Sequence, residues 1–424
     1  MKWLWAAAIC STSSGLHAAG YGIYDARTLA LGGAGVAMGN TEQGFYYNPA
    51  LMAFNDTSKN KGHNSRFFFP VLTAEASDGA REGAKIYDRH LDEKLTTAIK
   101  AFNDSDFSQA SAIKAVTASK DIQHAIDTLS GGNLTADAYA GLAIAIPSDS
   151  QGGSFFMGSR LVGGGLADIK PADRVLLNHY TDFLEYVAEN DSVMGAPNEG
   201  IFDANTGGLI DPTINNSINS TGVFRGAALS EVGVSASGRL NFEKADLALG
   251  ITPKIVQANL VDEEQRVVSD GVANDSKTQS HHYVNFDVGA AIQVRDHIRV
   301  GFAVKDIISK HFTSLKGHDI AFAPSYRLGL AYVEERFSLG LDGDLRPSES
   351  FAGEVTRQDL ALGGEYRVVP QLRVRAGYRH DISGTLDGTY SLGVGLQVWG
   401  LTADLAYATG GDQKSLGLQF GKMF

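Results

Sequence analysis

The chain has 424 residues, a formal net charge of −12, and 49 glycines against 10 prolines. This acidic balance argues against nucleic-acid binding through a basic patch, so we expect no nucleic-acid partner. Beyond the N-terminal segment, no apolar stretch reaches the roughly 18 residues of a membrane-spanning helix. The mean hydropathy of −0.10 still fits a membrane β-barrel, because only every second strand residue of a barrel faces lipid.

Residues 1–19 have the order of a secretory signal peptide. Lys2 supplies a positive charge, a short apolar run follows, and small residues lead up to Ala19, near which we expect cleavage. The only cysteine, Cys10, follows Ile9, where a lipoprotein signal would need a small residue. The mature chain would therefore contain no disulfide and no thiolate ligand or nucleophile.

The next segment, residues 20–63, carries the most specific motif of the chain. Its members are Gly32, Gly33, Gly35, Asn48, Pro49 and Ala50. The glycine spacing misses the dinucleotide-binding fingerprint, and no βαβ pattern supports one, so we expect no nucleotide site. Glycine permits positive φ and close backbone contact, and Asn-Pro favours a turn, which would end the segment before the first strand.

From residue 64 onward, apolar and polar residues alternate in run after run. Between Tyr390 and Val398, for example, one parity is apolar and the other holds serine, glycine and glutamine. This period of two predicts strands with one apolar and one polar face. About 14 strands are predicted, an even number as in bacterial single-chain barrels. They lie near 64–76, 136–147, 153–169, 226–240, 244–260, 280–294, 297–306, 324–333, 336–345, 356–367, 370–380, 389–399, 401–409 and 414–424.

A soluble β-sandwich would alternate as well, but three features favour a membrane. The runs have about 9 to 11 residues, the length that crosses a bilayer when tilted. Short connections such as Glu334-Glu335 alternate with longer loops, and Trp399 lies near a strand end, where an aromatic girdle is expected. The chain also ends in an alternating run with Phe424, which resembles an outer-membrane assembly signal. We predict an antiparallel transmembrane β-barrel over residues 64–424.

Helical insertions near 84–130 and 174–190 break the alternation. Apolar residues at helical spacing predict amphipathic helices over 84–103 and 109–129, and a third helix over 175–187. Two interpretations remain open for these helices. They would either cap the barrel mouth and shelter a ligand or serve as loop decoration.

If the apolar parity faces lipid, the other parity lines the lumen. It carries Arg373, Arg375 and Arg379, with Glu365 and Asp404 on nearby walls. Buried charges need partners, so we expect a lattice of ion pairs. The alternative is that Arg373 and Arg375 bind a carboxylate head group, because guanidinium binds carboxylates through two hydrogen bonds.

No pattern in the sequence points to catalysis or metal binding. The histidines considered are His281, His282, His311, His318 and His380, and none lies in a recognisable motif. Adjacent residues of a strand point to opposite faces, so His281 and His282 cannot easily share one metal. We expect no enzyme activity, no catalytic residue and no metal or other cofactor.

The glycine-rich stretch followed by Asn48-Pro49-Ala50 resembles the start of the FadL/TodX outer-membrane transporters. Even closer is the resemblance to the barrel family labelled conjugal transfer protein TraF. The periplasmic F-plasmid protein of that name is similar to thioredoxin, which a mature chain without cysteine cannot be. The resemblance implies an outer-membrane location in a Gram-negative bacterium and a lumenal plug over residues 20–63. Its place in the motif makes Phe45, Tyr46 and Phe54 candidate ligand-lining residues.

The resemblance implies two alternative functions. The first is binding or passage of small hydrophobic molecules across the outer-membrane lipid, as in long-chain fatty-acid transporters. The second is a structural or accessory role in a conjugal transfer or secretion assembly, with periplasmic assembly proteins as partners. A general porin is less expected, since a plug would block free diffusion.

Overall fold

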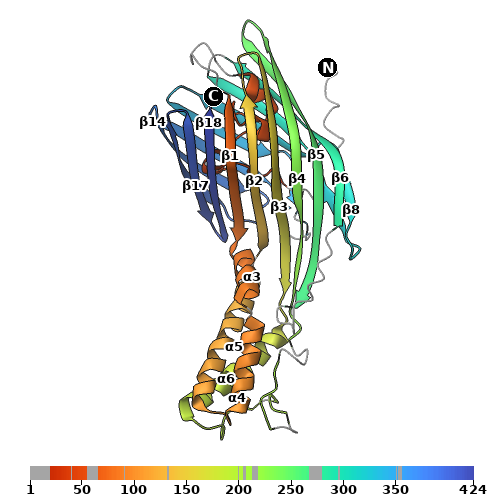
Figure 1. Cartoon of the computed structure of the whole chain (residues 1–424), viewed down its shortest axis with the longest axis vertical. Coiled ribbons are helices and arrows are strands. Elements are labelled where there is room, and N and C mark those ends of the chain that lie inside the picture. The colour runs from red at the N-terminus through yellow and green to blue at the C-terminus, as the bar shows by residue number, and fades with distance from the viewer. Residues whose placement is uncertain are drawn as a thin grey trace, which may run out of the picture.

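The computed structural model shows a closed antiparallel barrel of fourteen strands, which confirms the predicted fold (Figure 1). The residues described are 20–39, 41–54, 65–89, 91–130, 133–198, 200–203, 207–212, 218–266, 279–294, 297–349, 351 and 356–424. The predicted signal peptide, residues 1–19, and residues 55–64 at the end of the predicted plug lie outside this part of the chain.

Each barrel strand hydrogen-bonds to its neighbour in the chain order of the barrel, and β1 closes the ring against β18. The barrel strands are β1 (Arg66–Ser77), β2 (Leu134–Ile146), β3 (Gln151–Asp168), β4 (Thr221–Asn241), β5 (Ala245–Arg266), β6 (Gln279–Val294), β7 (Ile298–Lys305), β10 (Ser325–Val333), β11 (Phe337–Asp344), β14 (Asp359–Val369), β15 (Leu372–Asp381), β16 (Thr389–Val398), β17 (Leu401–Gly410) and β18 (Gln413–Met423). The predicted strand ranges all fall on these strands. Two short hairpins outside the barrel sheet were not predicted: β8 (Lys310–Thr313) with β9 (Asp319–Phe322), and β12 (Ser348–Glu349) with β13 (Thr356–Arg357).

The outer surface of the barrel carries an apolar band that ends sharply. One row of aligned outward residues on β3 to β6 is apolar: Met157, Val232, Ile255 and Val284. Two residues further along the strands, the aligned row is polar: Ser159, Ser230, Gln257 and His282. Ile255 exposes 62% of its surface, which is unfavourable in water but favourable in lipid. The apolar row thus gives way to a polar row on these strands, although Leu161, two residues beyond Ser159 on β3, is again apolar and 42% exposed.

The two ends of the barrel differ in their connections. At one end the strands join through short turns such as Trp399-Gly400, where Trp399 is 97% exposed. At the other end, the connections from β1 to β2 and from β3 to β4 carry helices, and those from β7 to β10 and from β11 to β14 carry hairpins. Short turns face the periplasm in bacterial barrels, and tryptophan favours the membrane interface. We therefore call the two ends the short-turn end and the long-loop end.

Four helices extend from the long-loop end (Figure 1). They are α3 (Asp78–Arg89), α4 (Leu91–Asp104) and α5 (Gln109–Leu129), between β1 and β2, and α6 (Pro171–Asn190), between β3 and β4. The single helix predicted over 84–103 was wrong, because α3 and α4 divide that region. The apolar spacing that suggested one helix belongs to α4, where it begins at Leu91, and α3 is largely polar. Among the described residues, none of the helices combines the length and apolar character needed to cross a bilayer.

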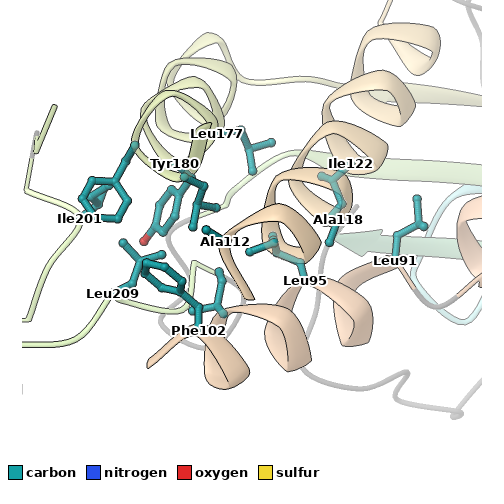
Figure 2. Packing of buried hydrophobic residues seen from close by; sticks show 14 of the residues in the cluster. Leu91, Leu95, Phe102, Ala112, Ala118, Ile122, Leu177, Tyr180, Ile201 and Leu209 are labelled. Atoms are coloured by element: carbon teal, nitrogen blue, oxygen red, sulfur yellow. The ribbon is translucent and has the colours of Figure 1, made fainter. Parts of the chain in front are cut away.

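These helices form a bundle with its own hydrophobic core. Figure 2 shows Leu95 and Phe102 of α4 and Ile122 of α5 packing toward Leu177 and Tyr180 of α6. Burial of a side chain such as Leu177 contributes about 1.5–3 kcal/mol. The bundle extends away from the barrel end rather than across it (Figure 1). The helices are therefore a separate packed unit, and the expectation that they cap the mouth is not met.

Residues 20–54 fold into the lumen as the plug. The plug elements are α1 (Ala26–Ala30), α2 (Gly44–Tyr47) and the 3₁₀ helix η1 (Pro49–Ala53). Ten barrel strands each present one glycine to the plug, at positions where a Cβ would lie 2.9 Å or less from a plug atom. These wall glycines are Gly152, Gly250, Gly289, Gly301, Gly329, Gly340, Gly363, Gly377, Gly393 and Gly417. The wall is thus bare of side chains where the plug backbone meets it.

We predict that Gly363→Ala weakens plug seating. The new Cβ would lie 2.5 Å from the Leu31 carbonyl oxygen and 2.8 Å from its Cβ. Overpacking of this kind typically costs about 1–3 kcal/mol. The thermal unfolding temperature of the purified barrel should therefore fall. Gly238→Ala on β4, where no atom lies within 4 Å, is the matched control and should leave it unchanged. Equal unfolding temperatures for both variants would show that the wall tolerates side chains there.

Candidate functional site

The plug is held to the wall by Asp342 of β11. This carboxylate is 1% exposed, and its Oδ2 accepts hydrogen bonds from the backbone N–H groups of Gly35 (2.6 Å) and Val36 (2.7 Å). Hydrogen bonds to a charged acceptor are the stronger kind. Just before them, Gly32 and Gly33 adopt φ values of +66° and +98°, which L side chains rarely do. The glycines of the motif thus turn the chain after α1 and bring it to Asp342.

Asn48 connects two parts of the plug to the barrel. Its Nδ2 donates to the carbonyl oxygens of Val36 (2.9 Å) and Ala290 (3.1 Å). Its Oδ1 accepts from the N–H of Ala50 at 3.2 Å and so caps η1, in which Pro49 occupies the first position. The Asn-Pro-Ala part of the motif therefore begins a 3₁₀ helix while anchoring it to β6.

The three aromatic candidates separate into two places. Phe45 and Tyr46 belong to a buried aromatic cluster, in which Phe45 lies 5.5 Å from Phe156 and Tyr46 stacks at 5.5 Å on Tyr24. The cluster fills the region between plug and wall, and neither residue lines the two large cavities described below. Phe54 lies apart from the cluster, beneath the guanidinium of Arg299 at 4.7 Å.

Arg375 forms the ion pairs expected of the lumen. Its guanidinium lies 2.6 Å from Glu365 and 2.6 Å from Asp404, and Glu365 also pairs with Arg27 of the plug at 3.1 Å. Strand register explains this choice, because Glu365 lies directly opposite Arg375. Arg373 differs: its Nη1 donates to the amide oxygen of Gln397 at 3.3 Å. The structure therefore separates two arginines that the sequence analysis treated alike.

A second group of charges surrounds Lys254 of β5, whose side chain is fully buried. Its Nζ lies 3.2 Å from Glu231, 3.2 Å from Asp287 and 2.8 Å from Asp306. Lys305 lies nearby, donates to the Tyr46 carbonyl oxygen at 3.0 Å and sits 3.9 Å from the ring centre of Tyr24. Alternation alone did not reveal these contacts, because it leaves the register of β4, β5 and β6 undetermined and because Asp306 lies beyond the end of β7.

Within the described residues, the lumen holds two larger cavities, one toward each end. The outer cavity, toward the long-loop end, has a volume of about 110 Å³, and its apolar lining includes Ile23, Leu29, Val162, Phe351 and Leu386. The inner cavity, toward the short-turn end, has a volume of about 250 Å³. Its lining includes Phe54, Arg373 and Arg375 together with Arg27 of the plug. The plug lies between these two spaces.

One histidine does meet an aspartate and a serine. His318 Nδ1 lies 2.8 Å from Asp262 Oδ2, and the same oxygen accepts the Ser314 hydroxyl. Burial opposes ionisation of Asp262, but hydrogen bonds from Ser314 and His318 outweigh it and hold the pKa of this carboxyl below its ordinary value. Because the serine bonds to the aspartate rather than to the imidazole, this is not the arrangement of a hydrolase triad. It fixes the turn of the β8–β9 hairpin to β5.

In the described part of the chain, no three histidine, aspartate or glutamate side chains are grouped so that they could hold a metal ion.

The sequence is similar to known proteins. A family described as "F plasmid transfer operon, TraF, protein" matches residues 45–344. A comparison with curated proteins found no match.

Solved structures with similar folds include hydrocarbon channels. The P. putida toluene transporter TodX is 12% identical with a TM-score of 0.47, and the alignment covers 95% of this chain and 98% of TodX. The CymD monoaromatic hydrocarbon channel is 10% identical with a TM-score of 0.46, over 95% of this chain and 97% of CymD. The family match covers well over half of the sequence, from α2 in the plug to the end of β11. The chain therefore belongs to the family described as "F plasmid transfer operon, TraF, protein".

Proposed function

We propose that this protein is an outer-membrane barrel of a Gram-negative bacterium that binds or passes small hydrophobic molecules, with the plug as its gate. The observation that carries the proposal is the lumen itself, in which residues 20–54 separate two cavities. A channel filled in this way does not conduct by free diffusion. Passage therefore requires the plug to rearrange.

The outer cavity suits an uncharged or apolar group. Its charged residues are already paired: Arg160 lies 2.6 Å from Asp137, and Arg327 lies 2.6 Å from Asp344. Glu75 pairs with two arginines of the same cavity. With these charges satisfied, the surfaces left for a ligand are apolar side chains such as Phe351.

The size of the outer cavity limits what it holds while the plug is seated. Its volume is about 110 Å³, whereas an apolar cavity of about 150 Å³ admits benzene. A long-chain fatty acid is far larger than either. A cargo of that size would therefore need the plug to move, which makes the plug contacts the part of the molecule to test.

The helical bundle supports a second candidate function, a structural or accessory role in a transfer or secretion assembly. The bundle α3–α6 has its own core and extends from the long-loop end, and lumenal passage does not require it. The family description, which names a transfer operon, agrees with this candidate. If the protein has an assembly role, deletion of its gene should change the mating frequency of the cells. If it acts only as a gated channel, deletion should leave the mating frequency unchanged.

For the first candidate, we expect cells lacking the gene to take up less labelled long-chain fatty acid than wild-type cells. The wild-type gene should restore uptake, and the Asn48→Ala, Pro49→Ala double variant should not. That variant loses the side-chain bonds to Val36 and Ala290 and the proline at the start of η1. Uptake is measured on intact cells with matched barrel levels. Unchanged uptake on deletion would remove fatty acids as the main cargo and shift support to the assembly role, for which mating frequency is the next measurement.

Asp342→Ala tests the gate more directly. The change leaves the N–H groups of Gly35 and Val36 without their acceptor, and each buried unpaired group costs about 1–3 kcal/mol. We expect the plug to open more often, so that the purified protein shows current steps in a planar bilayer that the wild type does not show.

Asp246→Ala is the matched control for this experiment. Asp246 lies on β5 near the short-turn end, has a side chain that is 31% exposed, and faces Arg239 at 3.9 Å. The Asp246→Ala channel should stay as closed as the wild-type channel. Identical closed recordings for both variants would mean that Asp342 does not hold the gate.

A further inference from the structure

The inner cavity is lined by more positive than negative charges. Seven arginines line it against four carboxylates, and the arginines come from the plug, β1, β7, the β10–β11 turn, β14 and β15. We call this cavity the arginine vestibule, and the residues that matter below are Arg27, Arg66, Arg299, Arg367 and Arg373. Arginine from several separate elements converges on one space of about 250 Å³.

Strand register places two of these arginines face to face. Arg367 of β14 lies directly opposite Arg373 of β15, two positions along from the complementary Glu365–Arg375 pair. Like charges opposite each other across a strand pair are destabilising. The nearest carboxylate of Arg367 is Glu335 at 3.6 Å, whose side chain is 89% exposed. Among the charges that act on Arg373, the Glu365 carboxylate is the strongest, and it is opposed by three arginines: Arg367, Arg66 and Arg27.

Two vestibule arginines have only uncharged oxygen partners. Arg299, 7% exposed, donates to the amide oxygen of Gln293 at 2.8 Å, and Arg373 donates to that of Gln397 at 3.3 Å. Among the described residues, no carboxylate lies within 4.0 Å of either guanidinium. Arg299 is thus a buried cation without a carboxylate partner, which is costly, so a bound anion would lower the energy of this arrangement.

Further donors in the vestibule have no acceptor. The Nη1 of Arg27 and the Nε of Arg66 are buried without a hydrogen-bond partner, and these residues expose 6% and 9% of their surfaces. The hydroxyl of Thr402 on β17 is in the same state. Arg27 also pairs with Glu365 at 3.1 Å and Arg66 with Glu42 at 2.9 Å, so the plug and β1 line this space with arginines that are paired but whose hydrogen bonding is incomplete.

We propose that the arginine vestibule binds a phosphate group that arrives from the short-turn end. Guanidinium offers planar pairs of donors that match phosphate oxygens, and several arginines together suit a dianion better than a single carboxylate. The group has two sources, a free phosphate or phosphate ester and a phospholipid head group. The proposal does not depend on the proposed gate function, since a closed barrel would bind phosphate equally well.

The test is calorimetric titration of inorganic phosphate into the full-length protein in dodecyl maltoside micelles at low salt. We expect saturable one-site binding to the wild type, and affinity at least about tenfold weaker in an Arg299→Gln, Arg373→Gln variant, because two charge-assisted contacts are lost. Arg174→Gln, the control for the single Arg373→Gln change, removes one arginine charge from α6 in the helical bundle and should change affinity less than about twofold. Sodium acetate should bind the wild type more weakly than phosphate does.

A second arm distinguishes the sources. The same titration is made with the protein in phosphatidylglycerol vesicles, and a head group in the vestibule would compete and weaken phosphate binding. A free phosphate source predicts equal affinity in vesicles and micelles. Both results support the phosphate site and assign its source.

The proposal is overturned if the wild type shows no saturable phosphate binding in micelles, or if the double variant binds as tightly as the wild type. Correct folding is checked by the heat-dependent mobility shift of the barrel. If the double variant does not assemble, the phosphate titration is made with Arg373→Gln alone. Arg373 is half-buried, so its replacement disturbs packing less than the replacement of the buried Arg299 does. Normal phosphate affinity in that variant would equally overturn the proposal.

Discussion

Close approach between the plug backbone and the barrel wall is the constraint on which the rest of the structure depends. A fourteen-stranded barrel leaves a lumen too wide to be filled by wall side chains alone, so the chain fills it with its own N-terminal segment. The segment fits because the wall presents glycines to it in a ring, and because Gly32 and Gly33 turn where other residues could not. Ten of the glycines of the barrel wall are thus explained by this contact surface.

Charge is the second constraint, and the lumen handles it in two ways. Where complementary residues face each other in register, as Glu365 and Arg375 do, the charges neutralise within the wall. Where the register brings arginine opposite arginine, neutralisation has to come from elsewhere. In the outer half of the lumen the charges are neutralised within the wall, whereas the inner half includes arginines that lie opposite each other. The plug therefore divides the barrel into compartments of different electrostatic character.

Sequence alone predicted the barrel well because its strands obey a strong rule. Lipid on one side and lumen on the other impose alternation on every spanning run, so the fourteen strands stood out. The hairpins β8–β9 and β12–β13 escaped prediction because strands of four and two residues are too short to show a period. The boundary between α3 and α4 was not predicted for a related reason. The turns of α3 are largely polar, so they show no apolar residues at helical spacing.

The candidate site was predictable only in part. Alternation indicates that Asp342 and Arg373 face inward, but not at what depth or opposite which residue. Asp342 could not be recognised as the acceptor for the plug because Asp344, two residues on, has the same parity and meets Arg327 instead. The difference between Arg373 and Arg375 likewise depends on the register with β14, which alternation leaves undetermined.

The polar row on β3 to β6 has a further geometric meaning. On β4 the strand continues from Ser230 to Thr221, and at about 3.3 Å per residue this part rises roughly 30 Å along the strand beyond the apolar band. Strands β15 to β17 have only 10 residues each and end close to the band. The rim of the barrel is therefore a slope rather than a circle (Figure 1). Beside the short strands, the barrel opening therefore lies close to the lipid surface. The longer strands on the opposite side form a wall that rises above the opening.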